Sequence, residues 1–116
     1  MVRGMKLYRG NDVIIERVET AGSFIKRLTG LLGKKNVPAG YGIYFPGCNS
    51  IHTFFMSCAI DVIMLSGSGK VESAFSGLNP WKIAVNPEAC DTVETVPGTI
   101  AACGIKKGDI LTLKNA

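Results

Sequence analysis

The chain has 116 residues, of which 47% are hydrophobic and 19% charged, and its formal net charge is +4. This composition excludes a disordered chain, and the length fits a single domain over residues 1–116 with one hydrophobic core. No apolar run reaches the roughly 18 residues of a membrane span, and the N-terminus lacks the apolar stretch of a signal peptide. We therefore expect a soluble, cytoplasmic protein, with a mature exported domain as the alternative.

The N-terminal third predicts a β-hairpin and then a helix. Short β-prone runs at residues 6–9 and 13–18 flank Gly10, Asn11 and Asp12, residue types that favour a tight turn. Apolar residues then recur at helical intervals near residues 23–32. This pattern predicts one amphipathic helix that covers an end or a face of a sheet.

The rest of the chain predicts short strands separated by glycine and proline. We expect them near residues 41–45, 71–75, 92–96 and 110–113, with a short helical turn near 99–103. Two further apolar runs, on either side of Ser57 and Cys58, predict a central hairpin. About seven or eight short strands with regularly spaced turns indicate a mainly β fold, either a β-sandwich or a closed barrel.

The central hairpin carries the only histidine, His52, and the acid Asp61. If Ser57 and Cys58 form a two-residue turn, His52 and Asp61 become diagonal neighbours on one face. A carboxylate beside an imidazole raises the imidazole pKa, which is the local chemistry of an acid/base pair. The alternatives are a hydrogen-bonded structural histidine and an Asp61 that accepts backbone N–H groups.

The aromatic residues of this region have two interpretations. Phe54, Phe55 and Met56 are expected in the core. Trp81, the only tryptophan, fits core or rim packing, and as the alternative it fits a ligand platform, because it follows a proline at a loop.

The spacing of cysteines and histidine argues against a metal site. The chain has four cysteines and no C-x-x-C pair, which does not match a zinc ribbon. Cys48, His52 and Met56 repeat every four residues, so neighbours in this series lie roughly 13 Å apart on a straight strand and cannot share one ion. We expect no metal and no cofactor. The cysteines are expected as free thiols in a reducing compartment, with two disulfides as the alternative.

Residues 48–56 read Cys-Asn-Ser-Ile-His-Thr-Phe-Phe-Met, and further motif positions follow in a fixed order along most of the chain. They are Arg27, Gly30, Leu31, Leu32, Gly42–Phe45, Ile60, Asp61, Val62, Pro80, Trp81, Glu94, Pro97, Gly98, Gly104, Ile105, Gly108 and Asp109. Together they resemble the domain of unknown function 192 family, in its Cys-x-x-Ile-His-Thr-Phe-x-Met subgroup. The resemblance implies a compact, mainly β sandwich or barrel with a small helical element, and no established activity.

The chain departs from this family's pattern at two positions. Ser57 stands where the family commonly has a basic residue, and Thr95 stands where it often has an aliphatic one. Anion binding by a basic residue at position 57 is therefore not expected here.

The first functional hypothesis is a small non-enzymatic module that binds a small ligand or a protein and is a monomer or a weak dimer. Its candidate pocket surrounds the central hairpin and consists of His52, Asp61, Cys48, Met56, Trp81 and Glu94. The second is an enzyme that uses His52 and Asp61 as acid/base, or Cys48 as nucleophile. The third and least favoured is nucleic-acid binding through Lys26, Arg27, Lys34 and Lys35.

Overall fold

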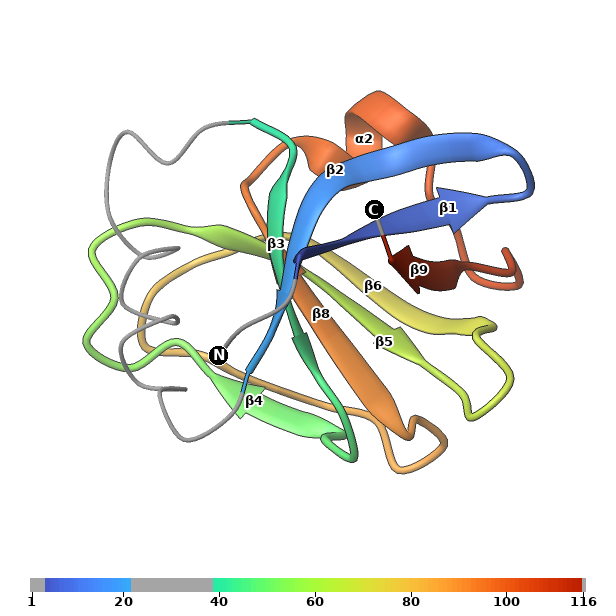
Figure 1. Ribbon diagram of the computed structural model, residues 1–116. Helices are drawn as coiled ribbons and strands as arrows, with labels where there is room; N and C mark the ends of the chain where they lie inside the picture. Colours follow the sequence, from blue (N-terminus) through green and yellow to red (C-terminus); the bar gives the residue numbers. More distant parts are fainter. Residues whose placement is uncertain (1–3, 22–38, 116) are drawn as a thin grey trace.

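The structure is a computed structural model that describes residues 4–21 and 39–115 (Figure 1). These residues form nine strands and one short helix. In chain order they are β1 (Gly4–Arg9), β2 (Asp12–Thr20), β3 (Tyr41–Phe45), β4 (Ser50–His52), β5 (Ile60–Leu65), β6 (Val71–Leu78), β7 (Ile83–Val85), β8 (Asp91–Thr95), α2 (Thr99–Cys103) and β9 (Thr112–Asn115). The prediction of a mainly β fold is confirmed.

The N-terminal hairpin and the C-terminal helical turn lie where the sequence predicts them. Strands β1 and β2 pair antiparallel, and the turn between them uses Gly10 at a φ of 63°. A left-handed φ costs glycine little, which is why this turn begins with that residue. Helix α2 coincides with the predicted helical turn at residues 99–103. The helix predicted near residues 23–32 lies outside the described residues.

Seven strands form one sheet in the order β6-β5-β8-β3-β2-β1-β9. All neighbours in it are antiparallel except β2 and β3, which run parallel. Strand β5 is paired on both sides and all six of its residues are buried, so both of its faces lie against hydrophobic clusters. This explains why its sequence is an almost continuous apolar run rather than an alternating one.

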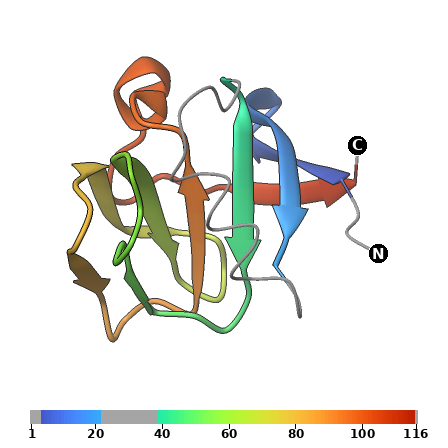
Figure 2. The same ribbon diagram turned by 90° about the vertical axis from the view of Figure 1, so that its left-hand side faces the viewer.

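The second sheet has two strands, β4 and β7, and packs over one face of the first (Figure 2). Ile51 of β4 and Ala84 of β7 point inward and join Ile43, Val62 and Met64 of the large sheet in one hydrophobic cluster. A second cluster lies between the other face of the large sheet and α2, and includes Ile63 and Ile100. Of the two predicted architectures, the layered one is observed, and the large sheet is not closed into a barrel.

The predicted central hairpin is wrong. Strand β4 pairs with β7, whereas β5 pairs with β6 and β8 in the other sheet. Strand β7 lies outside the ranges in which the sequence predicts strands. The physical reason is that His52 is followed by a loop with its own hydrogen bonds to residues 79–82, and this loop carries the chain from one sheet to the other.

Within the described ranges, no helix has the length and apolar character to cross a membrane.

Candidate functional site

Thr53 holds together the two loops at the end of the β4–β7 pair. Its side chain is fully buried, and its Oγ1 donates to the carbonyl of Asn79 at 2.6 Å and accepts from the N–H of Lys82 at 2.9 Å. Its backbone N–H donates to the Lys82 carbonyl at 2.9 Å, and its carbonyl accepts from the Trp81 N–H at 3.0 Å. One buried threonine therefore fixes residues 79–82 against the loop that follows β4.

Four rings gather where these loops meet, and we call them the aromatic platform: His52, Phe54, Phe55 and Trp81. His52 stacks on Phe54 with 4.7 Å between ring centroids, and Phe54 stacks on Trp81 at 5.7 Å. Phe55 meets Trp81 edge-on at 4.6 Å. The His52 Nδ1 accepts a hydrogen bond from the Phe54 N–H at 3.2 Å, which orients the imidazole. The platform is thus a continuous chain of ring contacts.

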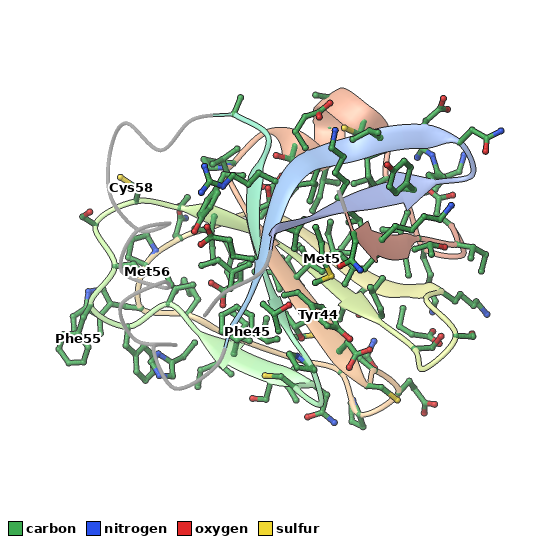
Figure 3. All side chains as sticks on the ribbon, viewed as in Figure 1. Met5, Tyr44, Phe45, Phe55, Met56 and Cys58 are labelled. Atoms are coloured by element: carbon green, nitrogen blue, oxygen red, sulfur yellow. The ribbon has the colours of Figure 1, made fainter. Side chains whose placement is uncertain are left out.

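The platform is exposed although three of its four rings belong to hydrophobic residues. Among the described residues, seven large hydrophobic side chains are exposed, and five of them are Phe54, Phe55, Trp81, Ile83 and Val85. Phe55 is 83% exposed and Trp81 59%. Figure 3 shows Phe55 projecting away from the body of the molecule. Clustered exposed apolar groups of this kind mark an interaction site more often than scattered ones do.

Phe55 and Trp81 also have unfavourable backbone conformations. They are the two non-glycine residues with positive φ in the described ranges, at 67° and 66°. The left-handed region costs a residue with a bulky side chain on the order of 1–2 kcal/mol. Strain of this size persists at functional sites when the surrounding structure enforces it. Here the hydrogen bonds of Thr53 fix the position of Trp81.

Asp61 has a structural role, as the alternative interpretation of the sequence predicts. It is completely buried, and its two carboxylate oxygens accept backbone N–H groups of Gly77 and Ile100, each at 2.8 Å. The N-cap residue of α2 is Gly98, which has no side chain that could cap the helix. Asp61 therefore caps the first turn of this helix from a neighbouring strand. Asp61 and His52 lie in different sheets, so the acid/base pair built on the central hairpin is not formed.

Glu94 is buried in the hydrophobic cluster beneath β4 and β7. It pairs with Val62 on one side and Ile43 on the other, and only 2% of its surface is exposed. No protein group among the described residues bonds to its Oε1. Burial raises the pKa of Glu94 from 4.5 to about 7, because the surrounding apolar groups do not stabilise a negative charge. Since Asp61 pairs with Thr95, the neighbour of Glu94, these two acids point to opposite faces of the sheet.

The sulfur-containing candidates lie mainly in the core. Met56 is buried in the same cluster as Val62, as expected, and Cys48 packs at its margin. The Cys48 Sγ donates to the carbonyl of Ser50 at 3.0 Å. All four cysteines are free thiols. No group of three or more His, Cys, Asp or Glu side chains in the described part of the chain is arranged to hold a metal ion.

The structure therefore separates the six predicted pocket residues. It brings His52 and Trp81 together through Phe54, places Met56 and Glu94 in the core below, and leaves Asp61 on the far face of the large sheet. The sequence prediction missed Phe55 as a surface residue and Thr53 as the residue that positions the loops. A polar Thr53 within an apolar run was the available signal, because such a group must find hydrogen-bond partners when it is buried.

Comparison with known proteins gives the fold and the family. A UPF0127 protein of Thermococcus kodakarensis is 32% identical over 101 residues, which are 83% of this chain and 64% of that protein. A UPF0127 protein of Pyrococcus furiosus is 32% identical over 113 residues, or 92% of this chain and 94% of its relative. This chain thus spans about two thirds of the Thermococcus relative's length.

Solved structures share the fold at low sequence identity. The crystal structure of a proposed transcription regulator from Sinorhizobium meliloti superposes with a TM-score of 0.76 at 18% identity, over 97% of this chain and 94% of that one. At this identity the likeness shows the fold alone. The family model of DUF192, described as "Uncharacterized ACR", matches residues 7–113. The chain belongs to the DUF192 family of uncharacterised proteins.

Proposed function

We propose that this protein is a small binding module whose aromatic platform contacts a partner protein. The observation that carries the proposal is the clustering of five of the seven exposed large hydrophobic side chains on β7 and the adjacent loops. Exposed rings lose little conformational freedom on binding, and aromatic side chains are enriched where binding energy is concentrated.

The strained conformations of Phe55 and Trp81 support the same proposal. A surface residue at positive φ is usually Gly, Asn or Asp, because these types avoid the steric cost. Phe55 has positive φ and therefore carries this steric strain. Its side chain is 83% exposed, so burial of the ring does little to offset the strain in the free protein. A contact made by the ring in a complex would supply a reason for a phenylalanine at this position.

Trp81 provides a built-in reporter for the experiment. It is the only tryptophan in the chain and is part of the platform, so its emission responds to a change of environment there. The probe is a library of random linear peptides displayed on phage and selected on the immobilised wild-type protein. Enriched peptides are then synthesised and titrated into the protein while Trp81 fluorescence is followed.

The test variant is Phe55→Asn, which removes the ring and places a residue at position 55 that tolerates positive φ. We expect it to weaken peptide binding by about tenfold or more, with no loss of stability. The matched control is Ile110→Asn, because Ile110 is 52% exposed but lies outside the platform. Equal binding by wild type and Phe55→Asn, or a library without peptides that alter Trp81 emission, would refute the proposal.

A further inference from the structure

Strand β7 has an edge beside the aromatic platform that no other described strand pairs with. The N–H of Asn86 donates to Asn49 and the N–H of Thr53 donates to Lys82, so the main-chain groups at positions 82 and 86 face β4. In an antiparallel pair, the main-chain groups of successive residues point alternately toward and away from the partner strand. Ala84 therefore faces β4 as well, whereas Ile83, opposite His52, and Val85, opposite Ser50, direct their N–H and C=O groups away from β4.

These outward groups have no hydrogen-bond partner among the described residues, since β7 pairs only with β4 there. We call them the β7 edge: the N–H and C=O groups of Ile83 and Val85. The side chains of the same two residues are 63% and 56% exposed. β7 is the short ochre strand at the lower left of Figure 2, at the margin of the molecule. An exposed strand edge with apolar side chains is a template for pairing with another chain.

Charge on the surrounding segments favours an acidic partner. Residues 49–60 and 76–87, which contain β4, β7 and both platform loops, have no Asp or Glu, and they include the exposed Lys82. A strand paired with β7 has alternate side chains on opposite faces. One set would lie beside Ile83 and Val85, and the other would lie on the side of Lys82 and Ala84.

We infer that the β7 edge binds an extended peptide segment of a partner protein in which β-branched apolar residues alternate with acidic ones. This inference rests on the proposed function, because the segment would contact the aromatic platform at the end of β7. Main-chain bonds to Ile83 and Val85 supply affinity, and the alternating side chains supply specificity. A second copy of this chain fits less well, because residues 82–86 have no acidic group to oppose Lys82.

The probe is a short synthetic peptide of alternating Val and Glu, titrated against the full chain with Trp81 fluorescence as readout. The test variant is Val85→Pro, which removes an outward N–H and leaves the bonds between Ala84 and Ile51 in place. Val85→Thr is its control, since threonine keeps the N–H and the β-branched shape. We expect Val85→Pro to bind about tenfold more weakly and Val85→Thr to bind within about twofold of wild type.

Two changes to the peptide test the inference without relying on a folded variant. N-methylation of the peptide N–H groups that pair with β7 should weaken binding by about tenfold. A peptide of alternating Val and Lys should bind roughly twofold to fivefold more weakly than the Val/Glu peptide, because it places positive charge near Lys82.

The outcomes separate this inference from the proposed function. If N-methylation and Val85→Pro leave binding intact while Phe55→Asn abolishes it, the platform binds but strand pairing is refuted. If Phe55→Asn has no effect either, both are refuted. Sedimentation of the free protein as a dimer that Val85→Pro dissociates would overturn the inference in favour of a second copy as the occupant.

Discussion

We expect Glu94 to make the stability of this protein depend on pH between about 4.5 and 7. Its pKa is raised from 4.5 to about 7 by burial. Well below pH 4.5 the carboxyl group is protonated in both the folded and the unfolded chain. Folding then does not have to bury a charged carboxylate. As pH rises towards 7, the unfolded chain loses the proton while the folded chain still holds it, so the free energy of unfolding falls.

The size of the effect follows from the two pKa values. A pKa difference of one corresponds to about 1.36 kcal/mol, and the difference between 4.5 and about 7 gives about 3 kcal/mol. Because only 2% of Glu94 is exposed, screening by solvent lowers this free-energy difference only slightly. For a domain of 116 residues, that corresponds to a fall in Tm of roughly 10 °C.

The variant Glu94→Gln tests this reasoning, because the amide has the same shape and does not titrate. Urea unfolding of both proteins from pH 4 to pH 8 should show that the variant becomes more stable relative to wild type as pH rises. The relative gain should reach about 3 kcal/mol above pH 7 and then remain constant. Parallel stability curves for the two proteins across this range would show that Glu94 does not titrate as a buried acid.

Substitutions at Asp61, Thr53 and Phe55 test other parts of the structure. Asp61→Ala should lower the free energy of unfolding by about 3 kcal/mol or more, since it leaves two buried N–H groups without an acceptor, and Asp61→Asn should cost less; urea titration measures both. Thr53→Val should lower the free energy of unfolding by about 1–3 kcal/mol and speed amide hydrogen exchange at Trp81 and Lys82. Unchanged exchange at these two residues would exclude the positioning role of Thr53. Phe55→Asn should leave Tm unchanged or raise it, since it relieves strain, and a clear loss of Tm would show that the ring stabilises the free protein.

Much of the local structure could be predicted from the sequence. The hairpin of β1 and β2 depends on a two-residue turn, Gly10 and Asn11, and α2 is the short run between Gly98 and Gly104. Both elements form from residues that are adjacent in the sequence, so the conformational preferences of those residues are enough to predict them. The motif residues likewise indicate the family, because their order along the chain does not depend on contacts in the fold.

The partner of β4 could not be predicted in this way. An apolar run of period two indicates that a strand has a buried face, but not which other strand lies beside it. Here the choice between β5 and β7 depends on Thr53, whose bonds reach residues 79–82, far along the chain. The prediction paired the two nearest runs, and the structure places them in different sheets.

The candidate site was predicted only in part, because it too depends on contacts between residues that are distant in the chain. His52 and Trp81 were named from the sequence and do lie together, yet Phe54 and Phe55 were expected in the core, because a ring's chemistry alone does not show whether it is buried. Conversely, the buried state of Glu94 arises from Ile43 and Val62 on neighbouring strands. The sequence by itself determined most of the extended segments and which residues are apolar. Only the tertiary structure decided which surfaces were left uncovered, because burial depends on packing between residues that are distant in the chain.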